Sequence, residues 1–446
     1  MKKIIVLSYF VVFLSSCKSF LDVQPDLQVD ESQAITNAST AEAAVNGLYN
    51  RLGSDGYYGS NFQAISYLSG GDIQWTGSQG APQEITARKL TADNGYVSNA
   101  WSSIYRTILA ANYLLETVPG LNDPQLTADR KNQIQGEALA IRALSYFDLA
   151  RGWGGVQLVL KSTRKPSDNT GISRSNLDGT YAQVLKDLTA AEPLLTNTTN
   201  RNRVTQKTVW AIRARYHLYR QEWDKAEEYA TKLIDDPSYK LVKPYSAFYA
   251  NNAVATTESV FEIAFSNSFK NGHSNWWLPP ALSGRREWAP NNQLVALLND
   301  PNIGGNRKEL IAQTAPPGNL WYGKLYYRTP LGTDPAYLIR IAELYLIRAE
   351  ARAQLGKATA ALADLNAVRD RAGVPLSQAP TKEALLVAID NERQVEFPFE
   401  GDRWFNLVRR GRAAEVLGIT DANKYVLPIP NSEILADKAL TQNQGY

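Results

Sequence analysis

Apolar residues recur at helical spacing in long segments of this 446-residue chain, and this pattern constrains the fold more than any other feature. The segments lie at 41–52, 97–118, 128–151, 176–195, 205–219, 223–234, 337–354, 358–371 and 382–396, with a shorter one at 404–410. Between about 240 and 334 the periodicity fades, Pro, Gly, Asn and aromatic residues dominate, and 259–265 has the pattern of an apolar strand. The sequence therefore predicts a mainly α fold with little β structure and a loop-rich insertion.

Two of the helix pairs carry small residues at the spacing of tetratricopeptide repeats. In the first pair, Trp210 and Ala214 lie on one helix, and Trp223 and Ala226 begin the next. Alanines at these positions let two antiparallel helices approach closely, while the aromatic rings fill the gap beside the next pair. The second pair has Tyr345, Ala349, Ala361 and Leu365 in matching places. Because long insertions interrupt the repeats, we expect a compact, tetratricopeptide-repeat-like helical array and not a regular solenoid.

The amino terminus has the pattern of a bacterial lipoprotein signal. Lys2 and Lys3 precede an apolar run at 4–14, which is shorter than the roughly 20 residues that a membrane-spanning helix needs. The run ends in Leu-Ser-Ser-Cys at 14–17, which resembles a lipobox, and the Cys17 thiol is the group that receives the lipid. Two or more acyl chains make a stable anchor. We therefore expect a signal peptide at 1–16, a covalent lipid on Cys17 and a tether at 17–30.

Composition argues against several kinds of site. Cys17 is the single cysteine, and His217 and His273 are the two histidines, so we expect no disulfide within the chain and no metal site built from His and Cys. No cofactor is indicated, and the sequence has no EF-hand loop pattern, although calcium held by oxygen ligands stays open. The formal net charge of +3 includes Lys2 and Lys3 of the signal peptide. The mature chain is therefore close to neutral, which disfavours nucleic acid and anionic membrane surfaces as partners.

Several sequence blocks carry more specific information than the periodicity does. They are CKSFLD at 17–22, RALSYFDL at 142–149, WGGV at 153–156, RIAELYLIRAEA at 340–351, LNAVRDRAG at 365–373, ERQVEF at 392–397 and EGDRWFNLVR at 400–409. In this order, over nearly the whole mature chain, they resemble the SusD/RagB family of outer-membrane lipoproteins.

The resemblance implies a SusD-like domain at 31–446, with helical repeats at about 41–235 and 337–410 and a variable insertion at about 240–334. It implies a helical scaffold that carries a loop-rich, variable ligand-binding face. It also implies a binding protein without catalytic activity, lipid-anchored at the outer membrane and facing the extracellular side. Members act as the lid of a TonB-dependent SusC-like transporter, and they mostly bind oligosaccharides, although some handle peptides.

The ten tryptophans divide into two groups. Packing explains those that fall in the helical segments, namely Trp101, Trp153, Trp210, Trp223 and Trp404. The others, Trp75, Trp276, Trp277, Trp288 and Trp321, fall in segments rich in Gly, Pro and Asn. A sugar offers C–H groups that pack on an aromatic face and hydroxyls that bind nearby polar side chains. Rings in such loops are therefore candidates for glycan binding.

The candidate ligand-binding residues are Asp72, Trp75, Trp276, Trp277, Arg285, Trp288, Trp321 and Tyr322, with Tyr57 and Tyr58 as weaker candidates. Asp72 and Trp75 belong to the stretch GGDIQW at 70–75, which resembles a loop that contributes ligand contacts in the family. The alternative is that these rings hold together loops that lack helical packing.

Other chemistry-bearing residues have structural explanations. The carboxylates of Glu392, Glu396, Glu400 and Asp402 are interleaved with arginines and aromatic rings, which predicts a buried ion-pair network and not a pair of glycosidase acids. His217 is expected to be packed on a repeat helix, whereas His273 is a possible ligand contact.

We therefore expect non-catalytic capture of an oligosaccharide and its delivery to the transporter. The alternative is a peptide or another non-sugar nutrient on the same scaffold, in which case Arg285, Arg286 and Arg307 would bind carboxylates bidentately. A lipid-anchored hydrolase is disfavoured, because no convincing catalytic pair is present.

Overall fold

The computed structural model describes residues 34–250 and 252–446. The predicted signal peptide, Cys17 and the predicted tether lie outside the described residues. Among the residues described, no helix combines the length and the apolar character that crossing a bilayer requires.

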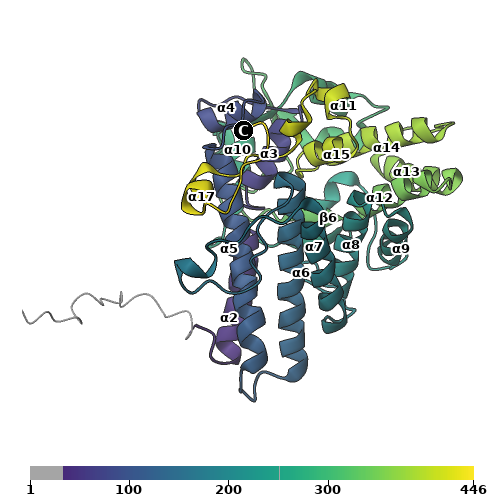
Figure 1. Cartoon of the computed structure of the whole chain (residues 1–446). Helices are drawn as coiled ribbons and strands as arrows, with labels where there is room; N and C mark the ends of the chain where they lie inside the picture. Colours follow the sequence, from purple (N-terminus) through teal and green to yellow (C-terminus); the bar gives the residue numbers. More distant parts are fainter. Residues whose placement is uncertain (1–33, 251) are drawn as a thin grey trace, which may run out of the picture.

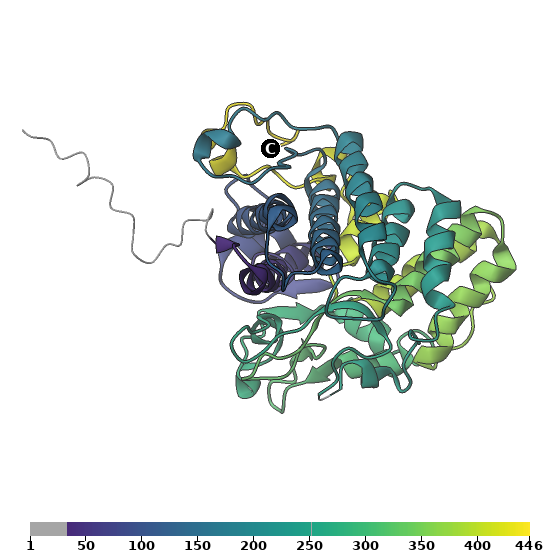
Figure 2. The same ribbon diagram turned by 90° about the horizontal axis from the view of Figure 1, so that it is seen from below.

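Long helices form the body of the protein (Figure 1). They are α2 (Ala38–Leu52), α5 (Gly95–Thr117), α6 (Ala128–Trp153), α7 (Leu177–Ala191), α8 (Gln206–Tyr219), α9 (Trp223–Ile234), α12 (Ile341–Gln354), α13 (Ala358–Ala372) and α14 (Lys382–Glu396). Side-chain oxygens of Asn94, Thr127 and Thr205 cap the first backbone N–H groups of α5, α6 and α8, which stabilises each helix by about 1 kcal/mol. Neighbours along the chain pack pairwise, so the helices follow one another in an arc (Figure 2).

The helix pairs pack as the small residues predict. Ala214 and Ala226 are fully buried where α8 meets α9, and α9 in turn packs on α12. A separate apolar cluster joins α12, α13 and α14 through Ala349, Ala361 and Leu365, among others. The prediction of a mainly α, repeat-like helical array is confirmed.

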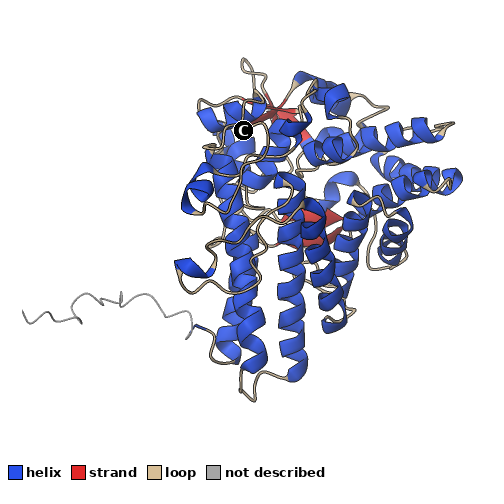
Figure 3. Ribbon diagram, viewed as in Figure 1, coloured by secondary structure: helices blue, strands red, loops and turns tan. Residues whose placement is uncertain are grey.

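Shorter elements lie between the long helices, in the loop-rich insertion and in the carboxyl-terminal region (Figure 3). The helices are α3 (Asn61–Ser69), α4 (Gly80–Thr86), α10 (His273–Trp277), α11 (Asn292–Asn299), α15 (Arg403–Arg409), α16 (Ala413–Leu417) and α17 (Asn431–Ala436). The strands are β1 (Ile73–Trp75), β2 (Ser259–Ile263), β3 (Trp288–Pro290), β4 (Ile311–Gln313), β5 (Trp321–Gly323) and β6 (Ala336–Arg340). They form the antiparallel pairs β1–β3, β2–β6 and β4–β5.

One predicted helix boundary is wrong. The periodic segment at 337–354 begins as strand β6, and α12 starts only at Ile341. Residues 336–340 pair with the predicted strand β2, with Ser259 opposite Arg340 and Ile263 opposite Ala336. A short apolar run fits a buried strand and a helix equally well, so tertiary pairing decides between them.

A buried ion-pair network joins the insertion to the repeat helices. Arg340, at the end of β6, donates hydrogen bonds to Glu258 at 2.9 Å, Glu396 at 2.8 Å and Glu400 at 2.6 Å. Arg307 and Arg371 also bind Glu396, at 2.7 Å and 2.5 Å. The three arginine side chains are 0% exposed. The carboxylates at 392–400 therefore have the structural role that the sequence predicts.

Breaking this network should destabilise the protein far more than breaking an exposed ion pair. Arg340→Met leaves Glu400 buried without a cation and removes one of the cations that bind Glu258 and Glu396, so we expect the free energy of unfolding to fall by about 3–5 kcal/mol. Lys243→Met is the control, because Lys243 binds Asp370 at 2.7 Å with both side chains largely exposed. That variant should lose less than about 1 kcal/mol. Urea denaturation measures both values, and equal losses would contradict the assignment.

The pH dependence of stability should reveal the unusual state of Glu400. Burial raises the pKa of Glu400 to about 7, although Arg340 acts in the opposite direction. Between the ordinary pKa of 4.5 and this value, the folded protein holds a proton that the unfolded chain has lost. The free energy of unfolding should therefore fall by roughly 1–3 kcal/mol as the pH rises from about 5 to about 8.

The glutamine side chain of Glu400→Gln is neutral at every pH, so this variant should lack this decrease in the free energy of unfolding. Urea denaturation of both proteins at a series of pH values measures the difference. Parallel slopes would show that Glu400 does not titrate in this range.

Candidate functional site

Three tryptophans meet where strand β1 and the insertion come together, at the upper end of the molecule in Figure 1. The β1–β3 register places Trp75 opposite Trp288. Trp276, from α10, stacks on Trp288 with ring centroids 5.4 Å apart and an angle of 24°. The centroids of Trp75 and Trp276 are 6.3 Å apart, and their rings are inclined by 46°. We call Trp75, Trp276 and Trp288 the tryptophan platform.

The platform has an open side and a closed side. Trp75 and Trp276 are partly exposed, whereas Trp288 is 0% exposed. Trp288 rests edge-on against the rings of Tyr67 at 5.7 Å and Trp277 at 5.6 Å. Trp276 is therefore held on an enclosed aromatic layer and Trp75 packs beside it, with part of both rings left for solvent or a ligand.

Charged side chains stand beside the open rings. The Arg285 guanidinium lies 5.1 Å from the Trp276 ring centroid and binds Glu287 at 2.5 Å. The Arg285 side chain is 46% exposed and the Glu287 side chain 14%. Burial raises the pKa of the nearby Tyr96 to about 12, and the Glu287 carboxylate adds to this effect, so the phenol keeps its proton near neutral pH. Stacking surface and hydrogen-bonding groups thus occur side by side.

Sequence reasoning missed two residues that shape this place, Gly77 and Glu287. A side chain at Gly77 would put its Cβ 2.4 Å from the Trp75 ring and 2.9 Å from the Glu287 carboxyl carbon. Glycine is therefore required for the ring and the carboxylate to come this close. The available signals were a glycine two residues after Trp75 and a lone acid between Arg285 and Trp288.

Trp321 and Tyr322 lie on β5, a strand that packs against β3. Trp321 is partly exposed, while Tyr322 is buried. Arg286 connects β5 to the platform, because its Nε donates a hydrogen bond of 2.8 Å to the Trp321 carbonyl oxygen. The backbone of β5 is therefore tied to the loop that leads into Trp288.

Other sequence candidates are enclosed by protein. Trp277 is 1% exposed and forms part of the layer beneath the platform. Asp72 is also buried, where its carboxylate accepts a 2.7 Å hydrogen bond from Gln394 and lies 3.2 Å from Arg403. Burial lowers the pKa of His273 to about 3, so this histidine stays neutral inside the aromatic layer. In this structure these three residues, like Trp288, support the site and have no open face for a ligand.

The weaker candidates Tyr57 and Tyr58 are enclosed too. Both phenols donate hydrogen bonds to the buried Asp148, at 2.5 Å and 2.8 Å. His217 is packed as expected, stacked on Tyr229 at 5.5 Å. In the part of the chain that the structure describes, no three His, Cys, Asp or Glu side chains are placed to hold a metal ion.

Two family models match the chain. Residues 19–218 match a SusD-like family described as starch-binding and associating with the outer membrane. Residues 323–422 match the SusD family. The chain belongs to the SusD/RagB family. Proteins of the SusD family bind without catalysing a reaction, and the resemblance inferred from the sequence blocks is confirmed.

Relatives and solved structures agree with this assignment. A SusD-like protein of Formosa agariphila is 25% identical over 497 residues, covering 97% of this chain and 96% of the relative. One of Bacteroides ovatus is 23% identical, with coverages of 91% and 82%. A SusD superfamily protein of Bacteroides vulgatus superposes with a TM-score of 0.81 at 20% identity, covering 94% and 99%. A laminarin-binding SusD-like protein gives 0.81 at 24%, covering 92% and 100%. The fold is therefore SusD-like.

The platform takes its residues from differently matched parts of this SusD-like chain. Trp75 lies within the first family match, whereas Trp276 and Trp288 lie at 219–322, which neither of the two matches covers. The scaffold is thus shared with the family, and the surface beside it is supplied by the insertion.

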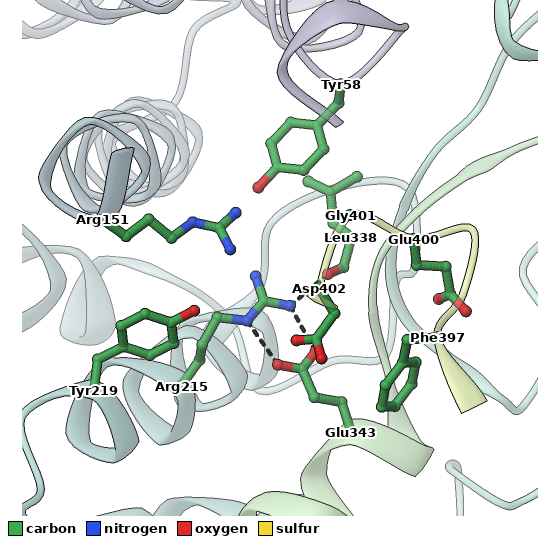
Figure 4. A pocket seen from close by; sticks show the side chains of 10 residues that line it. All are labelled: Tyr58, Arg151, Arg215, Tyr219, Leu338, Glu343, Phe397, Glu400, Gly401 and Asp402. Carbon is green, nitrogen blue, oxygen red and sulfur yellow. Dashed lines mark hydrogen bonds and ion pairs between the residues drawn. The ribbon is translucent and has the colours of Figure 1, made fainter. Parts of the chain in front are cut away.

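A small polar cavity lies between the repeat helices and the 397–402 turn (Figure 4). It has a volume of about 30 Å³, enough for about two water molecules. Arg215 binds Glu343 at 2.6 Å, and Arg151 binds Asp148 at 2.7 Å. The cavity is too small for a sugar, and its charges are already paired, which fits a structural role in a non-catalytic SusD family member.

The two stacked rings of the platform should differ in what they contribute to folding. Trp288→Ala removes a fully buried ring, so the free energy of unfolding should fall by about 3–5 kcal/mol. Trp276→Ala removes a partly exposed ring and should cost roughly 1–2 kcal/mol. Chemical denaturation of the two variants measures both decreases in the free energy of unfolding. A larger decrease for Trp276→Ala would show that its ring belongs to the core and not to the surface.

Proposed function

We propose that this SusD-like protein binds an oligosaccharide on the tryptophan platform and does not turn it over. The observation that carries the proposal is the pair of partly exposed rings, Trp75 and Trp276, with Arg285 and Glu287 beside them. Aromatic faces bind the C–H side of a sugar ring, and charged side chains bind its hydroxyls. Two rings inclined by 46° offer a bent stacking surface, which suits successive sugars of a curved chain.

Similar proteins support a carbohydrate as the ligand. The family description matched at residues 19–218 names starch binding. Structures with the same fold include the laminarin-binding protein and a SusD-like carbohydrate-binding protein of Bacteroides vulgatus, the latter with a TM-score of 0.72 at 23% identity. On this shared fold, loop geometry sets which sugar is bound.

The peptide alternative has less support from the geometry. It assigned carboxylate binding to Arg285, Arg286 and Arg307. Arg307 is fully buried in the ion-pair network, and Arg285 already binds Glu287. Of the three, Arg286 alone has no carboxylate within ion-pair distance among the described residues.

Anchoring and delivery complete the proposal. The lipobox pattern at 14–17 supports a lipid on Cys17 after removal of residues 1–16, followed by a tether at 17–30. The family description supports association with the outer membrane. We place the protein on the extracellular side, as the lid of a TonB-dependent SusC-like transporter that receives the bound sugar.

Removing either outer ring should weaken glycan binding. We expect Trp75→Ala and Trp276→Ala each to raise the Kd of a bound oligosaccharide about tenfold or more, because a lost stacking contact is worth about 1.4 kcal/mol. Trp223→Ala is the matched control, since Trp223 is also partly exposed but lies on repeat helix α9.

Isothermal titration calorimetry against a panel of oligosaccharides measures these affinities, and chromatography of the recovered ligand checks for cleavage. Unchanged affinity in both platform variants, or release of shorter sugars by the pure protein, would contradict the proposal.

A further inference from the structure

Arg286 has a backbone conformation that L-amino acids rarely adopt. Its φ is 51°, in the left-handed region, where a side chain costs roughly 1–2 kcal/mol. Two hydrogen bonds hold it there: its N–H donates to the Leu278 carbonyl oxygen at 2.8 Å, and its own carbonyl accepts from Thr76 Oγ1 at 2.5 Å. Thr76 follows Trp75 directly, so the strained residue is fixed at the edge of the platform.

The Arg286 guanidinium is only partly satisfied by the protein. Nε donates to the Trp321 carbonyl oxygen, while the two Nη groups have no hydrogen-bond partner among the described residues. Both Nη groups are accessible to solvent, since a fully buried polar atom without a partner is not found at either position. The side chain is nevertheless half-buried, and burial lowers its pKa from the ordinary value. A guanidinium keeps its charge under such conditions.

The neighbouring arginine is a contrast within the same loop. Arg285 is neutralised by Glu287 at 2.5 Å and packs on Trp276. Arg286 has no carboxylate within ion-pair distance in the described part of the chain, so residues 285–287 together carry one positive charge. A half-buried cation without a counter-ion is costly, and an anion from a ligand would offset that cost.

We propose that Arg286 binds an acidic group on the glycan, a carboxylate or a sulfate, and thereby selects charged oligosaccharides over neutral ones. This inference rests on the proposed function, because it takes the sugar to be bound on the tryptophan platform, at whose edge Arg286 lies. The planar guanidinium, with two free Nη groups, matches the paired oxygens of either anion. A neutral sugar would leave the charge of Arg286 uncompensated.

The test uses the mature chain and three hexasaccharides: neutral laminarihexaose, an oligogalacturonate and a sulfated galactan fragment. We expect at least one charged hexasaccharide to bind tenfold more tightly than laminarihexaose in titration calorimetry. Raising the salt concentration should reduce this difference in affinity, since screening weakens the attraction between the guanidinium and the anion. Comparing the uronate with the sulfate identifies which anion the site takes.

Variants of Arg286 assign the preference to this residue. Arg286→Met should abolish the difference between charged and neutral ligands, while Arg286→Lys should keep part of it. Arg286→Gly is a second test. It removes the guanidinium without straining the backbone, because glycine adopts a φ of 51° freely. Arg88→Met is the control: Arg88 also has a positive φ, of 57°, but it is exposed and lies outside the platform.

The outcomes separate this inference from the proposed function. Equal affinity for charged and neutral hexasaccharides, unchanged in Arg286→Met, would overturn the inference and leave glycan binding in place. Binding of acidic peptides with no binding of any hexasaccharide would overturn both.

Discussion

The buried contact between Arg340 and its carboxylates is the interaction on which the rest of the structure depends. Arg340 ends β6, Glu258 precedes β2, and Glu396 ends α14, so one guanidinium ties the insertion to the repeat helices. Each of these charges would be prohibitively costly to bury alone. The strand pair β2–β6 and the packing of α13 on α14 are therefore mutually dependent.

The same region positions the tryptophan platform. Tyr67 donates a 2.9 Å hydrogen bond to the Phe399 carbonyl oxygen, one residue before Glu400. The Phe399 ring packs edge-on against Trp277 at 4.7 Å. Trp277 and Tyr67 in turn support Trp288, the inner ring of the platform. A chain of packed rings thus connects the charged network to Trp276, which explains how an irregular segment holds an aromatic surface rigidly.

Periodicity and composition predicted the helical scaffold well but could not predict which loop residues face outward. The α-helices at 38–52 and 358–372 follow directly from apolar spacing, because each buries one face and its buried residues recur at the helical period. Trp276 and Trp277 are adjacent and chemically identical, yet one is partly open and the other is enclosed. Their difference is set by how the five-residue helix α10 lies on β3, a tertiary relation that no local pattern contains.

The β1–β3 pair brings together strands that lie more than 200 residues apart, as in the hydrogen bond between Thr76 and Arg286. A ligand that touches both Trp75 and Trp276 would bridge these two segments. Its binding energy would then oppose any local opening of the insertion, by mass action on the closed form. The loaded protein would resist proteolysis in the insertion more than the empty one does, while the helical array would be equally resistant in both. The free energy of local opening of the insertion would therefore be higher in the protein with bound sugar than in the empty protein.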